Sequence, residues 1–175
     1  MADRKRTKLT VEILKNYLEY NRDTGEFIWL KNKGRARVGD IAGTNKNNGY
    51  IGIAIFNGVY QAHRLAWFYI TGAWPKQYID HINGIKTDNR FINLREATNA
   101  QNLWNGGKHA NNTSGFKGVH FDTRSSKWIA QITVNCKRIH IGSFEDKLEA
   151  AEAYILESLE LHGEFSNYSP LISRG

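Results

Sequence analysis

The chain has 175 residues, a net charge of +7 at pH 7 and an isoelectric point of about 9.5. Hydrophobic residues make up 41% of it, with eight Phe, eight Tyr and five Trp, enough for the cores of one or two small domains. The positive charge favours a polyanionic partner, while no apolar run approaches membrane-spanning length and no apolar region follows the basic N-terminus. The single Cys136 excludes an internal disulfide and paired-cysteine zinc sites, so no structural zinc is expected and a reducing cytoplasm is the simplest compartment.

The charge is unevenly distributed along the chain. Residues 1–107 hold 16 Lys and Arg against 9 Asp and Glu, and residues 108–142 hold 6 against 1. Residues 143–175 hold 2 against 7. The C-terminal part is therefore close to neutral but polarised, with a basic segment followed by an acidic one.

The first seventy residues predict a basic arm, two helices and short strands. Thr10 can cap the first helix, and the Asn57-Gly58 pair suits a two-residue hairpin turn because both residues tolerate positive φ. Gly72 is expected to end the second helix. In chain order we expect an arm, a helix over 11–20, a turn at 23–25, a strand over 26–30, a loop over 31–48, a strand over 51–55 and a helix over 62–71.

Residues 78–105, YIDHINGIKTDNRFINLREATNAQNLWN, carry the pattern richest in chemistry. The expected order is a strand over 78–82, an irregular loop over 83–95 and a helix over 99–104, which is a β–β–α layout. Asp80 lies beside His81, Asn93 follows twelve residues after the histidine, and Asn102 lies on the helix. Carboxylate and amide oxygens suit a hard divalent metal, and an imidazole can take a proton from water.

This stretch resembles the HNH endonuclease motif of phage and intron-associated homing enzymes, through its D-H pair, D-N-R turn, N-L dipeptide and A-Q-N helix. The resemblance implies that His81 is the general base and that Asp80 and Asn102 bind Mg²⁺ or Mn²⁺ together with the scissile phosphate. Asn93, the middle residue of the motif, is assigned with His81 to the catalytic residues, with orientation of His81 and bracing of the loop as open alternatives. His63, in the segment QAHRLAW, is assigned to packing or to a phosphate contact.

A second unit is predicted after a linker. Three short strands over 117–121, 128–134 and 138–141 precede a helix over 145–161. Residues 114–168 resemble an AP2 DNA-binding domain, through the segments GFKGV, KWIAQI, RIHIGSF and EAAEAY. The resemblance implies that the sheet enters the DNA major groove. The family's contact positions fall on Lys117, His120, Lys127, Gln131, Thr133, Arg138 and His140. His120, Thr133 and His140 differ from the Arg and Trp of the plant factors, so the plant recognition sequence does not transfer.

The sequence thus predicts an α+β protein: an HNH (ββα-metal) nuclease domain, then an AP2-like three-stranded antiparallel sheet packed on one helix. The predicted ranges are arm 1–9, nuclease domain 10–107, linker 108–113, AP2-like domain 114–168 and tail 169–175. The expected function is metal-dependent cleavage of double-stranded DNA, with a nick in one strand at a specific site. The protein is expected to be phage-encoded, to act as a monomer in the host cytoplasm and to bind no membrane.

Two other functions were weighed against this prediction. One is a catalytically inactive, sequence-specific DNA-binding regulator, and the other is an interaction protein without nuclease activity. The intact set of Asp80, His81 and Asn102 argues against the regulator, and the polarised charge argues against the interaction protein. Because the proposed catalytic groups lie within 80–102, deletion of 108–175 is expected to leave a protein that still cuts, slowly.

Overall fold

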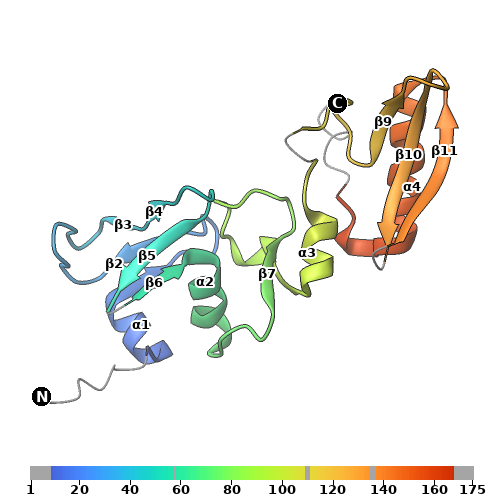
Figure 1. Cartoon of the computed structure of the whole chain (residues 1–175). Coiled ribbons are helices and arrows are strands. Elements are labelled where there is room, and N and C mark those ends of the chain that lie inside the picture. The colour runs from blue at the N-terminus through green and yellow to red at the C-terminus, as the bar shows by residue number, and fades with distance from the viewer. Residues whose placement is uncertain (1–8, 57, 109–110, 135–136, 168–175) are drawn as a thin grey trace, which may run out of the picture. The chain divides into compact units, whose positions relative to one another are not determined.

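The computed structural model describes residues 9–56, 58–108, 111–134 and 137–167. The chain divides into two compact units, Met1–Thr98 and Asn99–Gly175, and their positions relative to one another are not determined (Figure 1). The division falls nine residues before the predicted end of the nuclease domain, at 107; the predicted domain ranges stay predictions. Apart from Leu9, the predicted arm and tail lie outside the described residues.

The first unit consists of two helices and short antiparallel strands. Its helices are α1 (Val11–Tyr17) and α2 (Ala62–Thr71). One sheet contains β1 (Leu18–Tyr20), β2 (Phe27–Trp29) and β3 (Ile41–Ala42), and another contains β4 (Thr44–Asn45), β5 (Ile51–Ile55) and β6 (Gly58–Gln61). A hairpin of β7 (Tyr78–His81) and β8 (Leu94–Ala97) follows, with the 3-10 turn η1 (Phe91–Asn93) before β8.

Local chemistry explains where these elements begin and end. The Thr10 side chain accepts a hydrogen bond from the Ile13 amide at 3.3 Å, as its predicted role as a helix cap requires. The predicted helix over 11–20 is wrong beyond Tyr17, because Leu18 and Tyr20 are buried on either side of an exposed residue and pair with β2. That alternation is the period of a strand.

Three further differences concern turns and short strands. The predicted loop over 31–48 contains β3 and β4, each only two residues long and so too short to show an alternating pattern. The predicted loop over 83–95 contains η1 and the start of β8. Strands β5 and β6 form the expected hairpin, but the predicted Asn57-Gly58 turn is wrong at Gly58, which pairs with Ile55 as the first residue of β6 and leaves Phe56 in the connection; Asn57 lies outside the described residues.

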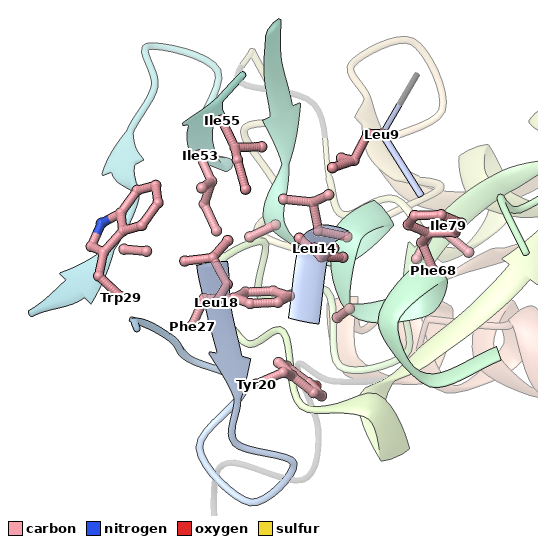
Figure 2. Packing of buried hydrophobic residues seen from close by; sticks show 14 of the residues in the cluster. Leu9, Leu14, Leu18, Tyr20, Phe27, Trp29, Ile53, Ile55, Phe68 and Ile79 are labelled. Atoms are coloured by element: carbon pink, nitrogen blue, oxygen red, sulfur yellow. The ribbon is translucent and has the colours of Figure 1, made fainter. Parts of the chain in front are cut away.

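The core of the first unit joins both helices to the sheets (Figure 2). Leu14 of α1, Leu18 of β1, Phe27 of β2 and Ile53 of β5 are each 0–1% exposed. Ile79 of β7 belongs to the same cluster. Burial of each such side chain contributes about 1.5–3 kcal/mol. This core therefore holds β7, the strand that carries the Asp–His pair.

The second unit contains α3 (Asn99–Asn105), β9 (Val119–Asp122), β10 (Lys127–Val134), β11 (Lys137–Phe144), α4 (Lys147–His162) and the 3-10 turn η2 (Gly163–Phe165). The strands form an antiparallel sheet in the order β11-β10-β9, and α4 packs on one face of it (Figure 1). Ala130 and Ile132 of the sheet and Tyr154 of the helix form its buried core.

The predicted architecture of three strands and one helix is therefore present, and residues 135–136, between the second and third strands, lie outside the described residues. The Asp146 side chain caps α4 by accepting from the amide of Leu148 at 2.6 Å. None of the helices within the described ranges combines the length and the apolar composition needed to cross a bilayer.

Candidate active site

The Asp–His pair occupies the end of β7. Both Asp80 and His81 are 4% exposed, and they pair in register with Arg95 and Leu94 of β8. Successive side chains of a strand point to opposite faces, so the two functional groups leave β7 in different directions. The core packing of Ile79 fixes the strand from which they project.

Asp80 is compensated by the residue opposite it. The Arg95 Nε donates to Asp80 Oδ2 at 2.9 Å, and Arg95 Nη2 lies 2.9 Å from the same oxygen. Both side chains are at most 11% exposed. A buried carboxylate without a cation is strongly unfavourable. The ion pair with Arg95 offsets the cost of burying the Asp80 charge and fixes the orientation of its carboxylate.

The ring of His81 is oriented by Asn89. The His81 Nε2 lies 3.1 Å from Asn89 Oδ1, and the Asn89 amide nitrogen donates to the Thr87 carbonyl at 3.3 Å. With the asparagine oxygen facing the ring, Nε2 carries the hydrogen and Nδ1 keeps the lone pair. Burial lowers the pKa of His81, against smaller opposing effects of Asn89 and Asp80. The imidazole is therefore neutral near pH 7, which is the state required of a base.

Asn89 itself is held by a turn from another part of the first unit. The Tyr20 hydroxyl donates to the Asn89 carbonyl at 2.6 Å, and Asn89 is 1% exposed. Gly25 has a φ of +76°, and a Cβ on it would lie 2.4 Å from the Arg90 nitrogen. Only glycine fits this close approach without strain. The turn after β1 thus supports the loop that orients His81.

Asn93 braces the loop between β7 and β8. Its Oδ1 accepts from the Asn83 amide at 3.0 Å, and its Nδ2 donates to Asn83 Oδ1 at 3.0 Å and to the Asp88 carbonyl at 2.8 Å. Two chelating bonds from Arg90 lower the pKa of Asp88 to about 2. These contacts favour the loop-bracing alternative for Asn93, and its assignment as a catalytic residue stays a prediction.

His63 of α2 packs against His81. Its ring centroid lies 5.0 Å from that of His81, at an interplanar angle of 85°, and 5.0 Å from that of Tyr50. Burial, followed by the charges of His81 and Arg64, lowers the pKa of His63 to about 3. A second neutral imidazole therefore lies beside His81; this contact favours the packing alternative for His63, and its assignment to packing or to a phosphate contact stays a prediction.

Asn102 lies on α3, which belongs to the second unit, whereas Asp80 belongs to the first. Within the ranges that the structure describes, no group of three or more His, Cys, Asp or Glu side chains could hold a metal ion. The predicted metal ligands therefore remain one carboxylate and one amide.

The sheet of the second unit gathers most of the predicted DNA contacts on one face. Cross-strand neighbours share a face. The register pairs Gln131 with His140, Thr133 with Arg138 and Ile129 with His120, and Lys127 belongs to the same alternating set of β10. A bulge between Ala130 and Gln131 shifts the register between β10 and β11. As a result His140 and Arg138 pair with Gln131 and Thr133 and lie on the same face of the sheet as these residues. We call the following set the open face: His120, Lys127, Gln131, Thr133, Arg138 and His140.

Lys117, the seventh predicted contact, is placed differently. It precedes β9, and its ammonium donates to the carbonyl oxygens of Leu103, Trp104 and Gly106. Its assignment as a DNA contact stays a prediction, while the structure gives this ammonium three partners at the end of α3.

Two residues that matter to the site were not assigned these roles from the sequence. Asn89 lies in the D-N-R turn, and only the fold shows that its amide reaches His81. Arg95 is the other, because only the fold brings its guanidinium against the Asp80 carboxylate. Its position opposite Asp80 depends on the register of β7 and β8.

Comparison with known proteins identifies the arrangement. A family model described as HNH endonuclease matches residues 60–103. Protein 3.8 of Escherichia phage T7 is 34% identical over 107 residues, covering 61% of this chain and 88% of that protein. Residues 60–103 belong to the HNH endonuclease family. The chain is accordingly a nuclease, and the matched range contains Asp80, His81, Asn93 and Asn102.

Two more distant relatives extend the comparison. An uncharacterized HNH endonuclease, L560, of Acanthamoeba polyphaga mimivirus is 33% identical over 111 residues, covering 62% of this chain and 57% of that protein. A solved structure titled "DNA binding and cleavage by the HNH homing endonuclease I-HmuI" is 26% identical and covers 50% of this chain and 49% of its own, with a TM-score of 0.39. That likeness is too partial to establish a common overall fold.

Proposed function

We propose that this HNH endonuclease hydrolyses a phosphodiester bond of double-stranded DNA in a metal-dependent reaction of the homing type. The observation that carries the proposal is the bond between His81 Nε2 and Asn89 Oδ1, which leaves a lone pair on Nδ1 of a neutral imidazole. A neutral imidazole in a fixed orientation can remove the proton of an attacking water.

The donor set fits a hard divalent cation. A carboxylate from Asp80 and an amide oxygen from Asn102 suit Mg²⁺ or Mn²⁺, with water and phosphate completing the shell. Zinc prefers His and Cys ligands, which this set lacks. When bound, such an ion would stabilise negative charge on the phosphate and on the departing 3′ oxygen. The ion pair with Arg95 orients the Asp80 carboxylate for this role.

The second unit supplies affinity for DNA in this proposal. Residues 108–142 carry 6 Lys and Arg against 1 acidic residue, and the six residues of the open face line one side of the sheet. We infer that the open face contacts DNA in the manner of an AP2-like domain. Phosphate contacts of this kind provide affinity that falls steeply with salt.

The expected product is a nick. One His81 and one pair of metal ligands give one active site per chain, so cleavage of both strands would require a second copy or a second binding event. We therefore propose that a monomer cuts one strand. The expectation of a phage-encoded enzyme acting in the host cytoplasm belongs to the same proposal.

Supercoiled plasmid provides the test. With Mg²⁺ the purified protein should convert it to the nicked circle, and EDTA should stop the reaction. Light scattering on the same sample should give the mass of one chain. Conversion that continues in EDTA would contradict the metal requirement, and a dimer that yields linear DNA in the first turnover would contradict the nicking monomer.

A further inference from the structure

Helix α3, which carries Asn102, is short and mostly not buried. Of the seven residues of α3, only Asn105 is buried. A helix this short is marginal in water, because its nucleation is costly and few hydrogen bonds follow. Contacts from other segments of the second unit contribute to its position.

The strongest of these contacts comes from Lys117. Its Nζ donates to the carbonyl oxygens of Leu103 at 3.2 Å, Trp104 at 2.7 Å and Gly106 at 2.6 Å. The last turn of a helix leaves such carbonyls without intrahelical partners, and its dipole favours a cation there. Lys117 is half-buried, and this burial lowers its pKa to about 8.

Two further side chains reach the same end of α3. The Trp104 ring lies parallel to the His162 ring, with centroids 4.3 Å apart and an interplanar angle of 9°. The Asn167 side-chain amide donates to the Asn105 carbonyl. Segments before β9, at the end of α4 and after η2 therefore converge on this short helix. Lys117 contributes the charged hydrogen bonds, which are the stronger kind.

We propose that Lys117 is a positioning residue of the nuclease, which holds the helix that carries Asn102 and so ties this metal-binding amide to the second unit. The inference rests on the proposed function, in which Asn102 is a metal ligand. It gives Lys117 a role other than the DNA contact predicted from the sequence. It also reverses the expectation that a chain lacking 108–175 still cuts, because that deletion removes Lys117, His162 and Asn167 together.

Point variants of the full chain test the role of Lys117. Lys117→Met keeps the length of the side chain but loses every donor, and Lys117→Arg keeps donors and charge. Lys108→Met is the matched control, because Lys108 is an exposed lysine in the same basic segment. Three quantities are measured: hydrogen exchange of the amides at 103–106 without metal, DNA affinity in EDTA, and the plasmid cleavage rate as a function of Mg²⁺ concentration.

Lys117→Met should speed exchange at 103–106 and lower cleavage between about 10- and 100-fold, with a higher Mg²⁺ requirement, as substitutions behind a metal ligand do. DNA affinity should stay within about twofold, Lys117→Arg should recover most of the loss, and Lys108→Met should match the parent protein. A Lys117→Met variant whose exchange at 103–106 is unchanged, or which cuts at the parental rate, overturns the inference. So does one that loses DNA affinity and cleavage in equal proportion.

The two proposals fail in different ways. A parent protein that binds DNA but never cuts it would contradict the proposed function. The exchange measurement needs neither metal nor DNA, and it decides separately whether Lys117 holds α3.

Discussion

Replacement of Asn89 should disable His81 without altering Asp80 or Asn102. Asn89→Ala removes the acceptor 3.1 Å from His81 Nε2 and the donor 3.3 Å from the Thr87 carbonyl. Each lost bond costs about 0.5–1.5 kcal/mol, and a buried N–H left without a partner costs about 1–3 kcal/mol. We expect the free energy of unfolding to fall by about 1–3 kcal/mol.

Catalysis should fall further than stability alone explains. Without Asn89 the imidazole has no fixed tautomer or orientation, and residues that orient a catalytic or metal-binding group typically contribute about 10–100-fold, or about 1.4–2.7 kcal/mol of barrier. The assay is the initial rate of plasmid nicking at a temperature where the variant is folded. Asn32→Ala serves as the control, because Asn32 is an exposed asparagine that accepts from the Val38 amide.

Asn89→Asp separates orientation from charge. A carboxylate still accepts from Nε2, but it favours the imidazolium, so the pKa of His81 should rise. The base must be neutral, and burial lowers its pKa below the ordinary 6.5 in the parent protein. The acid limb of the rate profile should therefore lie below pH 6.5 in the parent and move to higher pH in Asn89→Asp. A parental rate in Asn89→Ala, or an acid limb that does not move in Asn89→Asp, would refute this reasoning.

Two other substitutions test the support of the site and the DNA-binding surface. Gly25→Ala should lower the free energy of unfolding by about 1–3 kcal/mol more than Gly34→Ala. Both glycines have positive φ, but only at Gly25 would an added Cβ collide with backbone, 2.4 Å away. Equal decreases in the free energy of unfolding, measured by urea denaturation of the two variants, would contradict this prediction. Arg138→Ala on the open face should weaken DNA binding by about 1–3 kcal/mol if the guanidinium reads a base. A phosphate contact would instead weaken binding to all sequences about equally and lower its salt dependence, which titrations of two sequences at two salt concentrations measure; unchanged binding would exclude Arg138 from the interface.

Strong periodicity and capping made most elements predictable. Thr10, Gly72 and the apolar positions of α4 each act locally, so a single sequence suffices to place the helices near them. The β1 strand was missed because Leu18 and Tyr20 continue an apolar helical pattern, and only pairing with β2 favours the strand. Strands of two residues, such as β3 and β4, carry no pattern at all.

The sequence predicts the chemical groups of the site better than the residues that hold them in place. The D-H pair and its surrounding motif indicated an HNH nuclease, and the match of residues 60–103 to the HNH endonuclease model agrees with that; the roles of base and metal ligand stay predictions. The partners Asn89 and Arg95 act through tertiary register, which spacing along the chain does not reveal. The role of Lys117 could not be predicted from the sequence either. A lysine beside a basic strand suggests a contact to DNA, and only the structure shows its hydrogen bonds to three carbonyl oxygens.

The most direct test of the account compares His81→Ala with the parent protein on supercoiled plasmid, with DNA binding measured on the same samples. The account predicts that His81→Ala binds DNA as the parent does, loses most of its Mg²⁺-dependent nicking, and regains part of it when imidazole is added to replace the missing base. A His81→Ala protein that nicks plasmid as fast as the parent would contradict the assignment of His81 as the general base.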